Sequence, residues 1–494
     1  MFIGIDLGTS SVKTILIDEN QNILSTHTEN IEILNPSLGY YEQIPENWYK
    51  ATIKCFNKLK LDKPKEFSVV KALGISGQMH GATLIDNNYK VLRPCILWND
   101  TRSAKQCTYM ESQCSSLREK SGNIAMPGFT SPKILWVKEN ENEVFKKIYK
   151  VLLPKDYLRF RLTNSFFTDM SDASGTLWLN VKERRWSTTL LNLTDLSEDQ
   201  MPTLVEGIDK TASVDKRLAK EIGFEKEVLI AGGAGDQAAG ATGSGVIKSN
   251  QSVISLGTSG VYFSPSNKYV SNTKDAVHSF CHCIPETWHH MSVMLSATNS
   301  LDWVSKICGL NIEDTMKKIE NFSNFKFDLK STPYFLPYLS GERTPHNNSY
   351  LRGSFHLLST SSDVDSLIYS VIEGISFGIK DGYDAVHSVS QKSDEIYLIG
   401  GGSKNLYWAN LIASLLNQPI LIGEDANLGP ALGVARLAML STEDFSQNEV
   451  IKSMKIIEEC SIDKNLCERL DKRYKIWKQI VNTNKPIASK LMET

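Results

Sequence analysis

The sequence predicts an α/β protein with two domains of similar fold that face each other. Its 494 residues are enough for two domains, each with its own core. Nearly the same phrase occurs twice, as IDLGTSSV at residues 5–12 and as ISLGTSGV at residues 254–261. Glycine-rich turns that follow an apolar strand recur in both halves. A repeat about half a chain apart is too long for a solenoid, so we expect domains at residues 1–245 and 246–494.

The composition is that of an ordinary globular protein, with 41% hydrophobic and 22% charged residues. A net charge of -2 gives no general attraction to nucleic acid or to an anionic membrane. No apolar run is long enough to cross a bilayer, and the N-terminal segment lacks the basic start of a secretion signal. The nine cysteines are scattered irregularly, which favours reduced thiols in a cytoplasmic protein. We therefore expect neither a nucleic-acid partner nor a membrane partner.

The first half alternates between strand and helix patterns. Residues 2–24 contain two apolar β-branched runs around a Gly-Thr-Ser-Ser turn and lead toward a third strand. Residues 46–61 have the spacing of an amphipathic helix, and residues 69–86 repeat the strand–turn–strand pattern. Residues 133–150 and 155–162 are predicted to be helical.

The second half begins at the end of another strand–turn–helix unit. Residues 228–247 predict a buried strand, a glycine-rich turn and a small-residue helix, and residues 252–264 repeat the opening hairpin. Residues 366–386 predict a long helix, and residues 395–422 predict strand, triple-glycine turn, helix and strand. A glycine-opened, alanine-rich helix follows at residues 428–440, and the chain closes on a charged amphipathic helix.

The two repeated turns have a composition that suits a polyphosphate. Facing hairpins can hold phosphates from two sides through backbone N–H groups and hydroxyls, and glycine lets the backbone approach closely. The alternative is a pair of ordinary tight turns, in which Gly, Thr and Ser are common. The first phrase carries Asp6 where the second has Ser255. One carboxylate on one side can hold Mg²⁺ with phosphate oxygens as further ligands, so the asymmetry fits a nucleotide–Mg²⁺ site.

Asp236 is the candidate general base. It lies in GGAGDQAAG, at residues 232–240, where a glycine-rich turn opens a helix. A helix N-terminus favours the carboxylate, so we expect Asp236 to stay ionised at pH 7 and to accept a proton from a substrate hydroxyl. The alternative role is a helix N-cap. The motif resembles a dinucleotide fingerprint, but the next strand ends at Ser255 without the acidic residue that such a site needs.

Other motifs are less specific. The triple glycine at residues 400–402 suits nucleotide phosphate or ribose, and neither a P-loop nor the protein kinase motif set occurs. Met79 and His80 either line a cleft that holds a polyol or form a solvated turn. Arg102 favours a structural pair with a nearby aspartate. CHC at residues 281–283 fits no common zinc pattern and reads as a strand.

Three polar segments carry no motif value alone. KDYLRFRLTN and TDMSDASGT are rich in donors and acceptors, and SGERTPHNN is more typical of a loop clamp than of a site.

The combination of motifs resembles the FGGY carbohydrate kinases of the actin/Hsp70/sugar-kinase superfamily. The resemblance runs from about residue 2 to about residue 440, and its most specific segments are GIDLGTSSVK, SGQMHGATLID, TDMSDASGTLW, GGAGDQAAGATGSG, LSGERTPHNN and LIGGGSKNLYWANLIASLLNQPI. It implies two ribonuclease-H-like domains with ATP and a sugar in the cleft between them.

The resemblance also implies a role for each matched residue. Asp236 is the catalytic base and contacts the sugar, Met79 and His80 contact the sugar, and Asp6 is the magnesium-associated acid. The residues it assigns to the phosphates and the adenosine are Thr9, Ser10, Lys13, Thr258, Gly401 and Gly402.

The implied activity is ATP-dependent phosphorylation of D-xylulose with Mg²⁺, and a homodimer is a family-level expectation. Ribulose, another ketose or gluconate are alternative substrates. A sugar-independent ATPase of the same superfamily and a sugar-binding regulator without catalysis are the alternatives from other classes.

Overall fold

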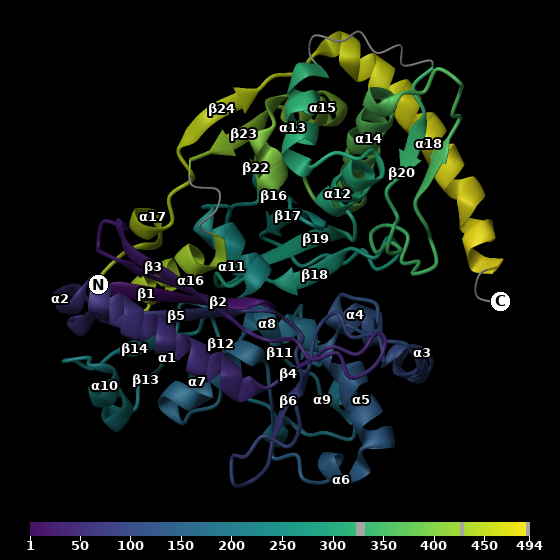
Figure 1. Cartoon of the computed structure of the whole chain (residues 1–494). Helices are drawn as coiled ribbons and strands as arrows, with labels where there is room; N and C mark the ends of the chain where they lie inside the picture. Colours follow the sequence, from purple (N-terminus) through teal and green to yellow (C-terminus); the bar gives the residue numbers. More distant parts are fainter. Residues whose placement is uncertain (323–330, 425–428, 491–494) are drawn as a thin grey trace.

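Two seven-stranded sheets form the centre of the molecule, one in each half of the chain (Figure 1). This computed structural model describes residues 1–322, 331–424 and 429–490. The first half, purple to teal, lies below the second half, green to yellow, in the view of Figure 1. Among the described residues, no helix combines the length and the apolar character needed to cross a membrane.

The first sheet has the order β13-β14-β5-β1-β2-β3, and β15 also pairs with β5. The central strand β1 runs antiparallel to β2 and parallel to β5. Because β1 is flanked on both sides, it is buried, as its apolar run predicts. The strands are β1 Phe2–Leu7, β2 Ser11–Ile17, β3 Ile23–Asn30, β5 Ala72–Gly77, β13 Lys210–Ser213, β14 Leu229–Ala231 and β15 Ala234–Gly235.

The second sheet repeats this arrangement, with the order β18-β19-β17-β16-β22-β23-β24. Its strand β16 runs antiparallel to β17 and parallel to β22, as β1 does with β2 and β5. The repeated phrase therefore occupies the same place in both sheets. The strands are β16 Gln251–Leu256, β17 Gly260–Ser266, β18 His278–Cys281, β19 Trp288–Met294, β22 Glu395–Ile399, β23 Ile420–Gly423 and β24 Ile456–Cys460.

Helices cover both sheets. The main ones are α1 Pro45–Asp62, α7 Pro154–Thr163, α11 Asp236–Gly243, α12 Thr298–Ile307, α13 Ile312–Asn321, α14 Val364–His387, α15 Leu406–Leu416, α16 Gly429–Leu440 and α18 Lys464–Lys490. The other helices are α2 Pro64–Ser68, α3 Ala104–Gln113, α4 Leu117–Ser121, α5 Thr130–Asn140, α6 Asn142–Phe145, α8 Met170–Ala173, α9 Thr188–Asn192, α10 Lys216–Ile222 and α17 Gln447–Val450. The remaining strands are β4 Glu42–Gln43, β6 Thr83–Ile85, β7 Cys95–Ile96, β8 Lys150–Leu152, β9 Phe167–Asp169, β10 Leu179–Asn180, β11 Arg185–Trp186, β12 Thr203–Val205, β20 Tyr334–Leu336 and β21 Ser354–His356.

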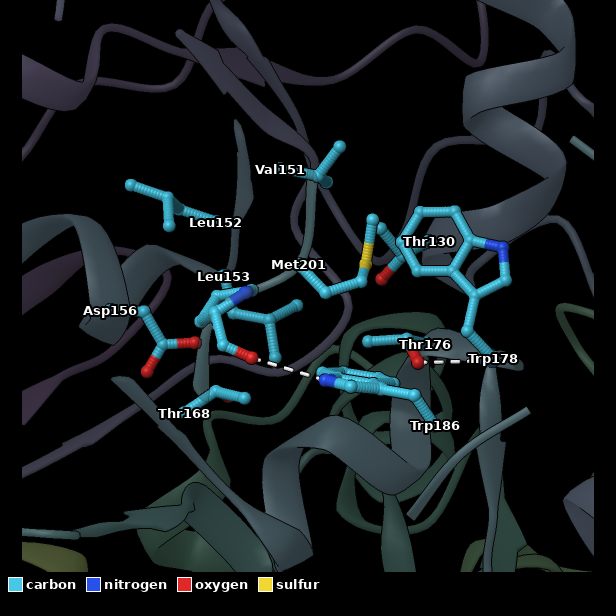
Figure 2. A pocket seen from close by; sticks show the side chains of 11 residues that line it. Thr130, Val151, Leu152, Leu153, Asp156, Thr168, Thr176, Trp178, Trp186 and Met201 are labelled. Carbon is cyan, nitrogen blue, oxygen red and sulfur yellow. Dashed lines mark hydrogen bonds between the residues drawn. The ribbon is translucent and has the colours of Figure 1, made fainter. Parts of the chain in front are cut away.

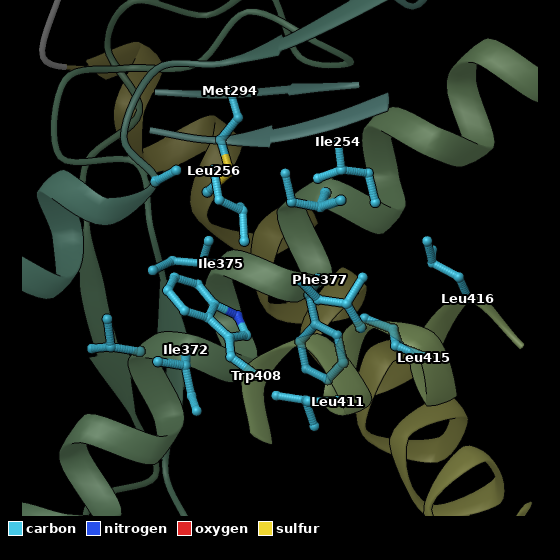
Figure 3. Close-up of a cluster of buried hydrophobic side chains, with 14 of the residues drawn as sticks. Ile254, Leu256, Met294, Ile372, Ile375, Phe377, Trp408, Leu411, Leu415 and Leu416 are labelled. Atoms are coloured by element: carbon cyan, nitrogen blue, oxygen red, sulfur yellow. The ribbon is translucent and has the colours of Figure 1, made fainter. Parts of the chain in front are cut away.

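The core of the second half lies between its sheet and the helices α14 and α15. Figure 3 shows Trp408 of α15 and Phe377 of α14 beside Ile254 and Leu256 of β16. The Trp408 indole donates to the Ser376 hydroxyl, 3.0 Å away, so its one polar group is satisfied inside the core.

One helix of the second half packs on the first sheet. The backbone of α16 lies so close to β1 and β5 that a Cβ on Gly4 would lie 1.9 Å from the Ala431 oxygen, and one on Gly74 would lie 1.8 Å from the Val434 oxygen. Only glycine permits this approach. The sequence predicts the helix but not its place, and the division of the chain at residue 245 stays a prediction.

The structure corrects one predicted element. Residues 133–150 are not one helix: α5 ends at Asn140, α6 is a short turn of helix, and residue 150 begins β8. Glu141, with φ -135 and ψ 51, breaks the helix between α5 and α6. β8 then pairs with β6, so a tertiary contact outweighs the local helical pattern. The CHC segment at residues 281–283 was predicted to lie in a strand. Only its first residue does, because β18 ends at Cys281.

Candidate active site

Asp6 lies at the junction between β1 and the first repeated turn. The Ser76 hydroxyl on β5 donates to Asp6 Oδ1 at 2.8 Å, and Asp6 is paired in register with Lys13 on β2. Burial raises the pKa of Asp6, while the hydrogen bond from Ser76 and the charge of Lys13 lower it. Asp6 is therefore a carboxylate held at an energetic cost, which a bound cation would relieve.

Two hydrogen bonds hold Thr9 of the first turn, whereas the tip of the turn is exposed. The Trp98 indole donates to Thr9 Oγ1 at 3.0 Å, and the Gln43 amide donates to the Thr9 carbonyl at 2.7 Å. Ser10 is exposed at the tip. The structure thus gives Trp98 a positioning contact with this turn, which the sequence did not suggest.

Asp236 is brought beside Asp6 by the register of three strands. Asp6 on β1 pairs with Ser76 on β5, and Ser76 pairs with Ala234 on β15. Asp236 begins α11 two residues later, and its Oδ1 accepts a hydrogen bond from the Gln237 backbone at 2.8 Å. Both acids therefore lie at the same edge of the first sheet, where the carboxyl ends of parallel strands meet.

The ionisation of Asp236 differs from the expectation. The helix N-terminus was expected to keep this carboxyl ionised at pH 7. Burial and then the neighbouring Asp6 charge instead raise the pKa of Asp236 to about 7. Desolvation and a like charge thus outweigh the helix dipole and the Gln237 hydrogen bond. A pKa near neutrality suits a general base.

Met79 and His80 lie on the same side as Asp236. A Cβ on Gly235 would lie 3.0 Å from Met79 Sδ, so Met79 packs directly on the residue before Asp236. His80 Nδ1 donates to the Gly175 carbonyl at 2.7 Å, and burial lowers the pKa of His80 well below its ordinary value. The neutral ring then has Nε2 as an acceptor, which can receive a hydrogen bond from a hydroxyl.

The second turn and the triple glycine lie together. Thr258 is exposed in the turn between β16 and β17. A Cβ on Gly400, whose φ is 91, would lie 2.6 Å from the Leu256 carbonyl, and one on Gly402 would lie 2.8 Å from the Leu256 side chain. Gly401 has nothing within 4 Å of the Cβ position, so a ligand can approach its backbone.

Comparison with known proteins decides the family. Models of the N-terminal and C-terminal domains of the FGGY family of carbohydrate kinases match residues 1–243 and 252–442. The chain belongs to this family. The expected α/β fold with two related halves is thereby confirmed.

Named members of the FGGY family match nearly the whole chain. A xylulose kinase of Escherichia coli (strain K12) is 47% identical over 443 residues, covering 89% of this chain and 90% of that protein. A xylulose kinase of Klebsiella pneumoniae is 42% identical over 490 residues, covering 99% and 100%. The crystal structure of a xyloylose kinase from Brucella ovis superposes with a TM-score of 0.95 at 41% identity, covering 98% of this chain and 99% of that chain.

One candidate residue of this FGGY kinase comes from the second half and was missed. Arg343 follows β20 in the loop that the sequence suggested was a clamp, and its Nη2 lies 3.6 Å from the position of a Cβ on Gly128. Burial is the main cause of the lowered pKa of His80 and of His278, and the Arg343 charge adds to it. In the part of the chain that the structure describes, its guanidinium makes no hydrogen bond or ion pair. A half-buried cation in this state needs an acceptor, which a sugar can offer.

Arg102 has the structural role that its motif favoured. Its guanidinium contacts Asp100 Oδ2 at 2.7 Å and Glu42 Oε1 at 2.7 Å. It stacks on Tyr40, with 3.9 Å from its central carbon to the ring centroid. These partners use its donors, so we assign no ligand to Arg102.

Proposed function

We propose that this chain is an ATP-dependent kinase that converts D-xylulose to D-xylulose 5-phosphate. The observation that carries the proposal is the register that sets Asp236 beside Asp6, next to the first of two matching small-residue turns. The printed names of the similar proteins support D-xylulose as the sugar.

In the proposed reaction Asp236 accepts the proton of the terminal sugar hydroxyl. That oxygen attacks the γ-phosphorus in line, the bond from phosphorus to the bridging oxygen of ADP breaks, and ADP leaves. Such transfer depends mostly on positioning and on stabilising charge. Thr9, Ser10 and Lys13 are proposed to contact the phosphates from the first half and Thr258 from the second, with Gly401 and Gly402 at the adenosine.

Asp6 is placed to bind a magnesium ion that arrives with ATP. Among the described residues, no group of three or more His, Cys, Asp or Glu side chains could hold a metal. Mg²⁺ at a phosphoryl-transfer site needs only one or two carboxylates, because phosphate oxygens and waters complete its shell. Asp6 would supply that ligand, and the ion would offset phosphate charge. A cytoplasmic location and a homodimer stay predictions of the sequence.

The first test is ADP release from Mg-ATP with D-xylulose, D-ribulose, L-ribulose, gluconate, glycerol or no sugar. We expect the highest turnover with D-xylulose and almost none without sugar. A different preferred sugar would keep the kinase and overturn the substrate. Equal turnover without sugar would make the chain an ATPase and overturn the proposal.

A further inference from the structure

Five charged side chains are buried together beneath the turn that leads to Asp236. They are Lys155, Asp156, Arg159, Asp169 and Asp172. The first three belong to α7 and the last two to the β9–α8 junction, two segments that match no motif by themselves. We call them the buried ion cluster. None of the five is more than 1% exposed. Charges this deep are costly unless they are paired, so the cluster needs an explanation.

Lys155 is the centre of the buried ion cluster. Its Nζ lies 2.5 Å from Asp156 Oδ1, 2.9 Å from Asp169 Oδ1 and 3.3 Å from Asp172 Oδ2. Burial lowers the pKa of Lys155, but the three acids raise it further, so the ammonium keeps its charge. Burial also raises the pKa of Asp172 well above its ordinary value, so Asp156 and Asp169 are the carboxylates that pair with Lys155 at neutral pH. Its ion pair with Asp169 connects α7 to the β9–α8 junction.

From Asp169 the contacts continue to the backbone before the base. The Ser171 hydroxyl donates to Asp169 Oδ2, and the Ser171 backbone N–H donates to the same oxygen at 2.8 Å. The Ser171 hydroxyl in turn accepts a hydrogen bond from the Gly235 N–H at 3.0 Å. Gly235 is the residue immediately before Asp236.

The other end of the same turn is held by Arg159, which donates from Nη2 to the Gly232 carbonyl at 2.5 Å. Between the two anchors, Gly233 has a φ of 77, and a Cβ there would lie 2.2 Å from the Ile75 carbonyl. Glycine adopts this conformation without strain, so the residues of the turn do not themselves restrict its backbone. Its position is therefore set by its contacts: backbone bonds from Gly232 and Gly233 and the pairing of β15 with β5, together with the side-chain bonds of Arg159 and Ser171.

We propose that the buried ion cluster, acting through Asp169 and the Ser171 hydroxyl, is a positioning device that fixes the backbone of Gly232–Gly235 and so aims the Asp236 carboxylate. The proposal rests on the proposed function, in which Asp236 is the base. Ser171 is a positioning residue, because its contact is with Gly235 and not with the reacting atoms. A displaced base loses rate steeply, because proton transfer and in-line attack both depend on geometry.

A small cavity lies beside Asp156 of the cluster. This cavity of about 10 Å³ is lined by Asp156 and by the indoles of Trp178 and Trp186. Figure 2 shows these side chains around it. The cavity is the size of one water molecule and too small for a sugar. Asp156 and Thr168 are among its lining residues, and Asp156 Oδ2 and Thr168 Oγ1 have no hydrogen-bond partner among the described residues. This cavity therefore offers no room for a sugar-sized ligand beside the cluster.

The test compares two serines of the same segment. Ser171→Ala removes the hydroxyl that holds Gly235. Ser174→Ala removes an equally buried hydroxyl, which donates to the Met170 carbonyl at 2.8 Å and accepts from the Cys281 N–H at 3.0 Å, away from the turn. We expect Ser171→Ala to lower kcat by about ten- to a hundredfold with KM for ATP and for sugar nearly unchanged. Ser174→Ala should keep the wild-type kcat at a similar melting temperature.

A second variant keeps the test decisive if Ser171→Ala folds poorly. Asp169→Asn keeps the shape and removes the charge that orients the Ser171 hydroxyl, so kcat should again fall without a rise in KM. Equal loss of kcat in the Ser171 and Ser174 variants, or a rise in KM alone, would overturn the positioning role. A wild-type protein without sugar-dependent turnover would instead overturn the proposed function.

Discussion

At the scale of the residue, the chemistry of Asp236 depends on neighbours that the sequence does not place. Motif reading found Asp236 and Asp6, but their mutual repulsion arises only when β1, β5 and β15 align. Local sequence showed a helix N-terminus, which would lower the pKa, whereas burial and the second acid raise it. A candidate site residue could therefore be named from the sequence, whereas its ionisation could not.

This ionisation predicts that Asp236 reduces stability at neutral and alkaline pH. Its pKa rises from 3.8 to about 7 on folding. A raised pKa in a folded acid contributes stability that is present below pH 3.8 and is lost as the pH rises to about 7. Without ligands, Asp236→Asn should therefore be more stable than wild type at pH 8, by on the order of 3 kcal/mol, and equal to it near pH 4. Urea denaturation at both pH values measures the difference.

The control for this prediction is Asp302→Asn, which removes a half-buried carboxylate from α12. The gain in stability at pH 8 should be specific to the Asp236 variant. Asp236→Asn should also lose almost all sugar-dependent turnover, because an amide cannot accept the proton. A variant that is no more stable than wild type at pH 8 would contradict the raised pKa, whatever its activity.

At the scale of the element, strands and turns were easier to predict than helix packing. The two hairpins, α1, α7, α14 and α15 follow from local patterns of apolar residues, turn glycines and caps. The site of α16 does not, because its contacts lie far away in the sequence. The sequence does not show which of its glycines are in tight contact with another element. In the structure, Gly433 lies beside the Ala239 carbonyl of α11.

The packing of α11 on α16 gives a matched pair of glycine substitutions. A Cβ on Gly433 of α16 would lie 1.9 Å from the Ala239 oxygen, so Gly433→Ala must push the two helices apart. A Cβ on Gly240 of α11 would find its nearest atom, Pro430 Cγ, at 3.9 Å. We expect Gly433→Ala to lose about 3 kcal/mol of unfolding free energy by overpacking. Gly240→Ala should lose nothing or gain about 0.5 kcal/mol, since alanine favours helix.

Urea denaturation of both variants measures these stabilities, and kcat adds a second reading. Because α11 begins at Asp236, its displacement in Gly433→Ala should also lower kcat. Similar stability for both alanine variants would show that the helices can separate without strain and would contradict the tight contact.

At the scale of the whole molecule, the two halves share contacts that no local pattern predicts. One buried cluster includes Met79 of the first half and Phe280 of the second. The Asn123 amide donates to the Ser279 carbonyl at 3.1 Å, and the His278 ring bonds to Asn123 Oδ1 at 2.9 Å. The repeat in the sequence predicted two halves but not how they are joined. The sugar side of the candidate site is consequently built from both.

A substitution of Arg343 tests whether both halves of the chain contribute to sugar binding. It belongs to the second half, yet its guanidinium lies against Gly128 and near His80 of the first half. A hydrogen bond from a charged donor contributes about 1.5–3 kcal/mol, so Arg343→Met should raise KM for D-xylulose by about ten- to a hundredfold. KM for ATP should stay unchanged.

The matched control for Arg343 is an arginine that already has its acceptors. Arg352, nine residues on, donates from Nη1 to the carbonyls of Ser349 and Leu351 at 2.8 and 2.7 Å. Arg352→Met should leave both KM values as in wild type. Initial rates of ADP release against each substrate separate the outcomes: a rise in KM for ATP alone would place Arg343 on the nucleotide side. Unchanged KM values in the Arg343 variant would mean that the first half binds the sugar without it.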